Sequence, residues 1–290
     1  MNIDFSIVIP AKNEQHNLPT LLDNIKKLHP SIDVIVINDG SSDETEKIAK
    51  QYGCKVISHP YSIGNGAAIK SGARAADTKY ILTMDADGQH DPNDISKLLS
   101  KLNDGYSMVV GARKRSSHAS FLRRLANDFY NFIASKLTGH PIRDLTSGFR
   151  IVDRRLFCRY LYLLPNGFSY PTTITMAFFR SGHSVAYTDI IAKKRKGKSH
   201  INPLVDGLRF LIIILKVGSL YSPLKFFTPP SILLFVFGII NYIYTYTTNG
   251  TFTNMSTLLI LSSTILFMFG MLAEQITVLT YASSQRRENE

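Results

Sequence analysis

Short apolar runs alternate with amphipathic segments through the first part of the chain. Three of the runs are almost continuously apolar, as in strands that are buried on both faces, and they span residues 5–9, 34–37 and 80–83. Shorter strands are predicted at 55–57 and 107–110, and Pro10 is expected to end the first strand. Helices are predicted between the strands, at about residues 17–28, before 52, before 76 and at 94–102. This alternation predicts right-handed crossovers and a mostly parallel sheet flanked by helices, so the expected fold class is α/β.

The pattern changes in the last third of the chain. No charged residue occurs from Phe226 to Ala273, and this range contains two long apolar stretches, 230–246 and 255–272. Each stretch approaches the roughly 20 residues that a helix needs to cross a bilayer. We therefore predict a hairpin of two transmembrane helices, at about 229–247 and 255–275.

Residues 204–220 lie between these two regions and place apolar side chains at helical spacing, with charged residues interspersed. This spacing predicts an amphipathic helix in the membrane interface, and a core helix of the preceding domain is the alternative. The expected organisation is a globular domain at 1–200, an interfacial helix within 201–225, and a hairpin with a short tail at 226–290.

The net charge of +11 indicates an anionic partner, which the charge distribution helps to identify. A basic run at residues 193–198 could contact nucleic acid, but the apolar spans that follow it favour an anionic membrane surface instead. Basic residues precede the first span and follow the second, at Arg286 and Arg287, so both ends are expected in the cytosol. The two cysteines, Cys54 and Cys158, agree with a reducing cytosol. The membrane could be a bacterial plasma membrane or an endoplasmic reticulum.

Polar side chains recur where the predicted strands end. Glu14, Asp39 and the pair Asp85 and Asp87 all follow carboxyl ends of strands, which meet at one rim of a parallel sheet. Asp85 and Asp87 are two residues apart and point to the same side of an extended segment. Together with Gln89 they offer oxygen ligands that suit Mg²⁺ or Mn²⁺ carried with a phosphate group. The alternative is that the two aspartates cap the next helix.

Two glycine patterns exclude common nucleotide sites. The segment Gly64-x-Gly66 lacks the third glycine of a dinucleotide fingerprint and does not follow the first strand, which excludes a Rossmann oxidoreductase. No GxxxxGK[ST] segment occurs in the sequence, which excludes a P-loop.

Three segments in order, 7–14 (IVIPAKNE), 38–45 (NDGSSDET) and 84–90 (MDADGQH), resemble successive signatures of the inverting GT-A glycosyltransferases of family 2. Two later segments, 111–113 (GAR) and 144–150 (DLTSGFR), resemble the branch that makes polyprenol-phosphate sugars, of the dolichol-phosphate mannose synthase type. The resemblance covers about residues 5–200. It implies a GT-A fold and a nucleotide-sugar donor of the GDP-mannose or UDP-glucose type.

The resemblance also implies roles for individual residues. Asp39 and Glu14 would lie near the base and ribose, and the full set expected at the nucleotide sugar is Pro10, Ala11, Asn13, Glu14, Asp39, Gly66 and Asp85. The metal on the diphosphate would be held by Asp85, Asp87 and Gln89. One departure from the family is the segment 167–173, which lacks a carboxylate and offers instead the hydroxyls of Tyr170, Thr172 and Thr173.

A lipid monophosphate acceptor has a second pKa of about 6 and is already largely ionised at neutral pH. Positive charge that positions the acceptor is then more important than a strong base. We expect Arg113 and Arg123 nearest the acceptor phosphate, with Asp144 as a base, an acceptor orienter or a cap of the following turn. Further acceptor contacts are expected from Arg150, Lys194, Arg195 and His200.

These observations predict an enzyme that moves a hexose, with inversion, from a nucleotide sugar to polyprenol phosphate at the cytosolic membrane face. The expected partners are the nucleotide sugar, the lipid and the membrane, with no nucleic acid and with a possible homo-oligomer. Two alternatives remain: a family 2 transferase acting on another lipid or glycan, and a membrane scaffold without catalysis.

Overall fold

The computed structural model describes residues 3–113, 121–167, 169–191, 212, 218–219 and 221–286, with the backbone alone at 121–124, 126 and 283–286. The chain forms two compact units. The first contains residues 1–135 and 140–210, and the second contains residues 136–139 and 211–290.

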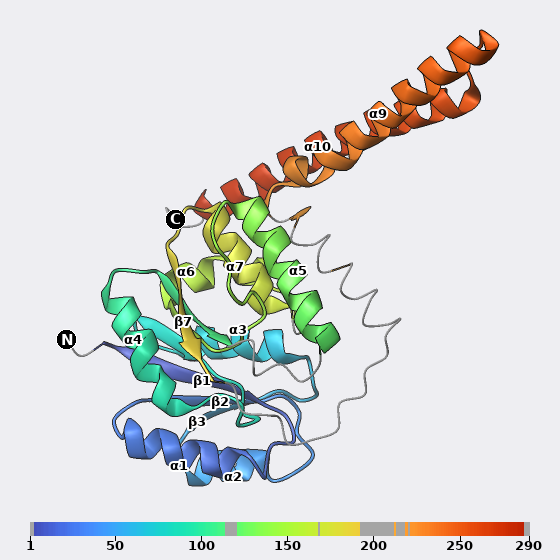
Figure 1. Cartoon of the computed structure of the whole chain (residues 1–290). Helices are drawn as coiled ribbons and strands as arrows, with labels where there is room; N and C mark the ends of the chain where they lie inside the picture. Colours follow the sequence, from blue (N-terminus) through green and yellow to red (C-terminus); the bar gives the residue numbers. More distant parts are fainter. Residues whose placement is uncertain are drawn as a thin grey trace. The chain divides into compact units, whose positions relative to one another are not determined.

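The first unit is built on a seven-stranded sheet with the order β3-β2-β1-β4-β6-β5-β7 (Figure 1). The strands are β1 (Phe5–Ala11), β2 (Val34–Asn38), β3 (Lys55–Ser58), β4 (Tyr80–Thr83), β5 (Met108–Arg113), β6 (Arg150–Asp153) and β7 (Val185–Ile190). Only β6 runs antiparallel to its neighbours, β4 and β5. The prediction of a mostly parallel α/β sheet is therefore confirmed.

Helices cover both faces of the sheet (Figure 1). They are α1 (Leu18–Leu28), α2 (Thr45–Gln51), α3 (Asn65–Ala75), α4 (Ile95–Asn103), α5 (Phe121–Thr138), α6 (Arg154–Arg159) and α7 (Tyr170–Arg180). Ile7 and Ile9 of β1 pack with α1 and α4 in the main core, whereas Val8 points to the other face and contacts α3 at Gly72. This period of two explains why the runs are apolar throughout, because each strand is covered on both sides.

Strand β1 continues two residues further than the sequence predicts, because Pro10 does not end it. Pro10 pairs with Ile37 of β2 and lies beyond Val8, which pairs with the last residue of β4, Thr83. The amide of Met84 donates to the carbonyl of Val8, so the backbone groups of Val8 and, two residues on, of Pro10 face β4. The pairing of β1 with β4 ends at Val8 and Thr83, so no residue of β4 lies opposite Pro10. The missing N–H of Pro10 therefore removes no hydrogen bond between strands.

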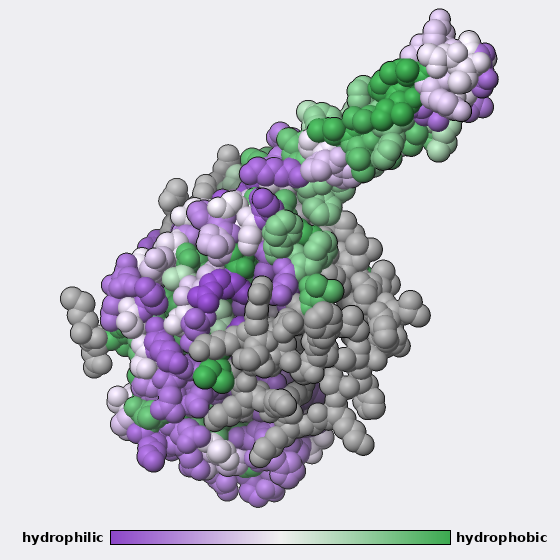
Figure 2. All heavy atoms as spheres, viewed as in Figure 1, coloured by the Kyte–Doolittle hydropathy of each residue, from purple (hydrophilic) through white to green (hydrophobic). Residues whose placement is uncertain are grey.

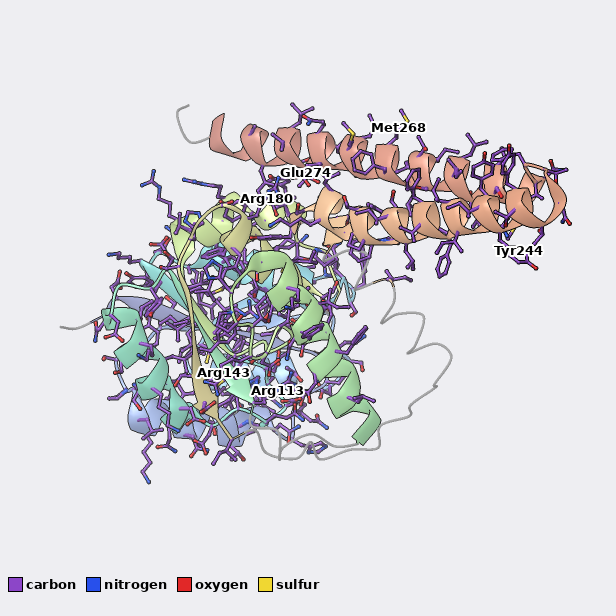
Figure 3. The ribbon with its side chains drawn as sticks, turned by 45° about the horizontal axis from the view of Figure 1, so that its top comes forward. Arg113, Arg143, Arg180, Tyr244, Met268 and Glu274 are labelled. Atoms are coloured by element: carbon purple, nitrogen blue, oxygen red, sulfur yellow. The ribbon has the colours of Figure 1, made fainter. Side chains whose placement is uncertain are left out.

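The second unit contains an antiparallel pair of long helices, α9 (Pro223–Asn249) and α10 (Asn254–Arg286). Both are long and apolar enough to cross a membrane, and only 11% and 17% of their most apolar windows are buried, unlike the core helices of a soluble protein. Figure 2 shows apolar side chains along the middle of the pair and polar ones at its tip. Tyr244 and Met268 point outward from the two helices (Figure 3).

Polar contacts inside the hairpin set how α9 and α10 face each other. The Ser231 hydroxyl donates to the carbonyl of Ser263 over 2.9 Å, and the Ser256 hydroxyl donates to Asn241 Oδ1 over 2.8 Å. Near the base, a Glu274 oxygen accepts hydrogen bonds from the Ser222 hydroxyl and from the amide of Leu224, in the first turn of α9. The two helices include the two spans predicted from the sequence. The interfacial helix expected within 201–225 falls mostly outside the described residues.

Candidate functional site

A pocket of about 480 Å³ opens at the carboxyl ends of β1, β2 and β4. It is lined by Pro10, Ala11, Lys12, Glu14, Asp39, Ser62, Gly64, Asn65, Asp85, Ala86, Asp87, Gln89 and Gly167. The structure thus brings together most of the residues that the sequence places at a nucleotide sugar. The additional lining residues are Lys12, Ser62, Gly64, Asn65, Ala86 and Gly167. Of these, Lys12 lies between two expected residues, Ala11 and Asn13, but no sequence pattern marks it as a site residue.

Two of the residues expected at the nucleotide sugar, Asn13 and Gly66, do not line this pocket. Asn13 adopts a positive φ of 56°, and its side-chain oxygen accepts a hydrogen bond from the amide of Ser42 over 2.9 Å. It therefore joins the loops that follow β1 and β2. At Gly66, a Cβ would come within 2.1 Å of the carbonyl oxygen of Pro165, so this glycine allows the segment before α7 to pack on the start of α3. Both residues therefore position segments of backbone that border the pocket, without lining it themselves.

Asp39 organises one side of the pocket. Its carboxylate accepts hydrogen bonds from four groups, namely His59 Nδ1, the Ser62 hydroxyl, and the amides of Ile63 and Gly64, at 2.8–2.9 Å. Burial alone would raise the pKa of Asp39, but these hydrogen bonds outweigh it and hold the pKa below its ordinary value. A carboxylate has about four acceptor sites, so Asp39 is fully used in holding the 59–64 loop against the end of β2.

Replacing Asp39 by asparagine is expected to lower the free energy of unfolding by about 3 kcal/mol, because an amide group would oppose donors that now bind a carboxylate. Affinity for a nucleoside diphosphate with Mn²⁺ should fall with it, as the loop loses its anchor. Urea unfolding in detergent and calorimetric titration measure the two effects. Asp33→Asn, an exposed position just before β2, is the matched control. An equal change in both variants would contradict this role of Asp39.

Asp85, Asp87 and Gln89 follow β4 and contribute side chains to the same pocket. Among the described residues, no three His, Cys, Asp or Glu side chains are grouped so that they alone could hold a metal. Two carboxylates and an amide nevertheless fit Mg²⁺ or Mn²⁺, because such ions are commonly held by one or two carboxylates and completed by substrate phosphates. The Asp87 oxygen also accepts a hydrogen bond from the amide of Gln89 over 3.1 Å, which curls the segment around these oxygens.

His90 lies beside Asp85, and although it belongs to the 84–90 segment no role was expected for it from the sequence. Its ring stacks on Phe149, with 5.1 Å between the centroids, and its Nδ1 is 4.0 Å from an oxygen of Asp85. Burial lowers the pKa of His90 below its ordinary value, so the ring is neutral at physiological pH. His90 therefore supports Asp85 by packing and adds no positive charge to the pocket.

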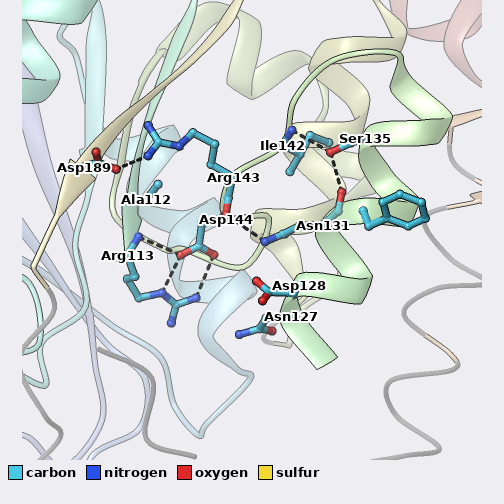
Figure 4. A pocket seen from close by; sticks show the side chains of 11 residues that line it. Ala112, Arg113, Asn127, Asp128, Asn131, Ser135, Ile142, Arg143, Asp144 and Asp189 are labelled. Atoms are coloured by element: carbon cyan, nitrogen blue, oxygen red, sulfur yellow. Dashed lines mark hydrogen bonds and ion pairs between the residues drawn. The ribbon is translucent and has the colours of Figure 1, made fainter. Parts of the chain in front are cut away.

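A second pocket, of about 570 Å³, lies beside the end of β5 and is bounded by α5 (Figure 4). Its lining residues are Ala112, Arg113, Asn127, Asp128, Asn131, Phe132, Ser135, Ile142, Arg143, Asp144 and Asp189. Arg113 and Asp144, which the sequence places at the acceptor, are its central charged pair. Arg143 pairs with Asp189 over 2.5 Å, and both of these side chains are about half exposed.

Arg113 and Asp144 form a two-pronged ion pair. Arg113 Nε donates to Asp144 Oδ2 over 2.7 Å, and Nη2 donates to Oδ1 over 3.0 Å (Figure 4). The Thr146 hydroxyl accepts a further hydrogen bond from Nη2 over 2.6 Å. The Asp144 oxygens also accept from the amides of Arg113 and Thr146. Burial would raise the pKa of Asp144, yet the Arg113 guanidinium holds it below the ordinary value. A carboxylate so occupied is a poor proton acceptor, which favours the orienting role over that of a base.

The remaining acceptor residues have different positions. The side chain of Arg123 and the residues Lys194, Arg195 and His200 lie outside the described part of the chain. Arg150 is 0% exposed, which does not fit the expected contact with an acceptor phosphate. The sequence places it in a motif but does not show that β6 inserts between β4 and β5 and turns this side chain inward.

The hydroxyl groups considered as substitutes for a missing carboxylate are also buried. Tyr170, Thr172 and Thr173 are at most 2% exposed and lie in the first turn of α7. The Thr172 hydroxyl accepts a hydrogen bond from Tyr130, and the Tyr170 hydroxyl points to the carbonyl of Gly148 at 3.5 Å. Tyr170 and Thr172 thus connect α7 to its neighbours, whereas the Thr173 hydroxyl donates to the carbonyl of Ser169 at the start of the same helix. None of the three lines either of the two pockets described above.

Comparison with protein families gives two matches. The model described as Glycosyl transferase family 2 matches residues 6–161, and the model described as GtrB C-terminal hairpin matches residues 222–279. The first match contains Arg113 and all residues that line the first pocket except Gly167, and the second contains most of α9 and α10.

Several curated proteins are similar to the chain. A dolichyl-phosphate hexose transferase of Haloferax volcanii is 29% identical over 74% of this chain and 93% of its own length. An undecaprenyl-phosphate 4-deoxy-4-formamido-L-arabinose transferase of Proteus mirabilis is 32% identical over 57% of this chain and 56% of its own. An uncharacterized protein of Methanocaldococcus jannaschii is 36% identical over 50% and 62%. The chain thus spans less than two thirds of the length of the last two relatives.

Solved structures show the same fold. Glucosyl-3-phosphoglycerate synthase from Mycobacterium tuberculosis, in complex with Mg²⁺ and uridine diphosphate, superposes with a TM-score of 0.60 at 20% identity, over 74% of this chain and 79% of that one. The same synthase with Mn²⁺, uridine diphosphate and phosphoglyceric acid gives a TM-score of 0.59. The predicted GT-A fold is therefore confirmed.

Proposed function

The chain belongs to glycosyl transferase family 2, and from this premise we propose that it moves a hexose from a nucleotide-diphosphate sugar to a polyprenol phosphate. The proposal rests on one observation: a single chain contains both a family 2 domain and a GtrB-type hairpin. The names of two relatives, which act on dolichyl phosphate and undecaprenyl phosphate, support the same acceptor class.

The pocket at the carboxyl ends of β1, β2 and β4 is proposed as the binding site of the nucleotide-sugar donor. Its oxygen ligands Asp85, Asp87 and Gln89 would hold Mg²⁺ or Mn²⁺ on the diphosphate, as the solved relatives with uridine diphosphate and these ions suggest. The bound ion supplies Lewis-acid stabilisation of the charge that develops on the leaving nucleoside diphosphate. Glu14 and Asp39 line the same pocket, and we propose that they lie near the base and ribose. Lys12 adds a positive charge to this anionic rim.

The pocket of Arg113 and Asp144 is proposed as the site of the acceptor phosphate. The ionised phosphate would attack the anomeric carbon from the face opposite the diphosphate, which inverts its configuration and needs no strong base. Asp144 holds the Arg113 fork in place for this step. Arg123, Lys194, Arg195 and His200 remain proposed contacts of the lipid headgroup, and Arg150 is omitted from this set because of its burial.

We propose that the hairpin anchors the chain with its catalytic domain in the cytosol, where the domain would meet nucleotide sugars. The basic segments of the chain would there contact the anionic leaflet of the membrane. The membrane would be a bacterial plasma membrane or an endoplasmic reticulum. A homo-oligomer stays a prediction from the sequence.

The test is to incubate membranes that contain the protein with nucleotide sugars labelled in the sugar, with and without Mn²⁺. Undecaprenyl phosphate and dolichyl phosphate are added in parallel samples. We expect one donor, of the GDP-mannose or UDP-glucose type, to label an acid-labile lipid in a metal-dependent reaction. Label in a polymer or in another lipid would favour a different acceptor. Donors left intact in every sample would favour a scaffold.

A further inference from the structure

Arg150 places a full positive charge in the interior of the first unit. The residue is 0% exposed, and no carboxylate lies within hydrogen-bonding distance of its guanidinium among the described residues. A guanidinium stays charged at neutral pH even though burial lowers the pKa of Arg150. Burying an unpaired charge is costly, and a residue that only fills space would avoid the cost. Arg150 is not used by the mechanism proposed above.

The guanidinium connects two segments that flank the site. Its Nη2 donates to the carbonyl of Ser147, and its Nη1 donates to the carbonyl of Pro171 over 3.1 Å and to the Thr175 hydroxyl over 3.0 Å. Pro171 and Thr175 belong to α7, whereas Ser147 belongs to the turn that leads from Asp144 into β6. One planar group therefore fastens this turn to α7.

The fastened turn is in contact with Asp85, one of the proposed metal ligands. A Cβ on Gly148 would lie 3.0 Å from an oxygen of Asp85, so the backbone passes directly against this side chain. The Gly148 carbonyl accepts a hydrogen bond from the Thr83 hydroxyl over 2.6 Å, at the end of the strand that carries Asp85. The same turn begins at Asp144, which holds Arg113. The segment 144–148 thus links the donor pocket to the acceptor pocket.

The sheet register explains why this position is suited to the link. Arg150 pairs with Thr83 of β4 on one side and with Val110 of β5 on the other. Strand β4 leads to Asp85 and strand β5 leads to Arg113, so Arg150 stands between the two strands that carry the two halves of the site.

We propose that Arg150 is a positioning residue that sets the separation and alignment of donor and acceptor, by holding the carbonyl of Ser147 and through it the 144–148 turn. Its charge also interacts favourably with the carboxylates of Asp85 and Asp144, neither of which is hydrogen-bonded to it. For its catalytic consequence the inference rests on the proposed function, but the structural part does not.

The test compares Arg150→Met, which removes the charge and the fork at similar volume, with Arg150→Lys, which keeps the charge and loses the fork. Arg154→Met is the matched control, because Arg154 follows the other end of β6 and donates to the carbonyl of Thr78, away from both pockets. Three quantities are measured on the full-length protein in detergent: hydrogen exchange of peptides covering 144–149, affinity for uridine or guanosine diphosphate with Mn²⁺, and kcat and KM for transfer.

In Arg150→Met we expect faster exchange at 144–149, nucleotide affinity within about threefold of wild type, and a kcat about 100-fold lower, since a displacement near 1 Å is enough for such a loss. Arg150→Lys should regain about tenfold in kcat by keeping the charge. Arg154→Met should leave all three quantities unchanged.

Different failures are distinguishable. Unchanged exchange at 144–149 in both Arg150 variants overturns the proposal, whether or not the protein transfers sugar. A wild-type kcat in Arg150→Met, or an equal loss in Arg154→Met, overturns the positioning role. If Arg150→Met does not fold, the test uses the hydrogen exchange and the kcat of Arg150→Lys, and wild-type values of both would overturn the proposal. A wild-type protein that transfers no sugar contradicts the proposed function instead, and exchange alone then decides the role of Arg150.

Discussion

Replacing Asp87 by alanine is expected to lower sugar transfer by at least about 1000-fold, because the developing charge on the diphosphate would lose its metal ligand. The protein should remain folded, since the Asp87 side chain is partly exposed in the pocket and contributes no apolar packing. Transfer at saturating acceptor, measured across a range of Mn²⁺ concentrations, gives the size of the effect. Thermal unfolding of the same samples gives the fold.

Asp91→Asn is the control for this experiment. Asp91 lies four residues later in the same segment, where its side chain accepts a hydrogen bond from the amide of Asn93, and asparagine caps such a turn about as well as aspartate. It removes the same charge from the neighbourhood without touching the pocket lining, so transfer should be unchanged. A fully active Asp87→Ala variant, with the same metal dependence as wild type, would falsify the metal assignment.

Replacing Arg113 by methionine is expected to lower the free energy of unfolding by about 3–5 kcal/mol, because it leaves a buried carboxylate without its partner. The side chain of Asp144 is only 7% exposed and receives both prongs of the Arg113 fork. Transfer should fall by about 100-fold or more, since the acceptor phosphate loses the cation that orients it. Urea unfolding and acceptor-dependent kinetics measure the two effects separately.

The double variant Arg113→Met, Asp144→Leu separates stability from function. Without the orphaned carboxylate most of the lost stability should return, whereas transfer should remain low. Arg143→Met is the control, because the Arg143–Asp189 pair lies in the same pocket but is about half exposed and should contribute little to stability. If the single and double variants were equally unstable, the ion pair would not be the source of the effect.

The pH dependence of stability provides an independent measurement of the same pair. Because the pKa of Asp144 is lowered in the folded protein, its contribution is fully present above the unfolded pKa of about 3.9 and is lost as the pH falls through the folded value. The stability difference between wild type and Asp144→Asn should therefore be large at neutral pH and shrink in acid. A difference that grew in acid would contradict the lowered pKa.

The sequence was sufficient to predict the first half of the sheet and the rim at its carboxyl edge. Continuous apolar runs at 5–9, 34–37 and 80–83 are local signals, and the polar residues that follow each run are positioned by the strand itself. For this reason Glu14, Asp39 and the two aspartates after β4 were found together. Lys12 was within the same segment but carries no pattern that distinguishes it from a solvent-exposed cation.

The roles that the sequence missed depend on contacts between distant segments. The Asp39 carboxylate accepts four hydrogen bonds from a loop that begins twenty residues later in the chain. No local sequence pattern predicts these four donor groups. Arg150 looks like an acceptor cation in its motif, but strand β6, which the sequence did not predict, buries it between β4 and β5. Charge can be read from a sequence, whereas burial of a charge depends on the topology of the whole sheet.

The polar contacts between α9 and α10 constrain how this hairpin can change in evolution. An α-helix turns by about 100° per residue, so inserting or deleting one residue of α10 between Ser256 and Ser263 would rotate Ser263 away from Ser231. Substitutions at outward positions such as Tyr244 and Met268 leave those contacts intact. We therefore expect close homologues to keep the number of residues between Ser256 and Ser263. The outward side chains should instead vary among apolar residue types.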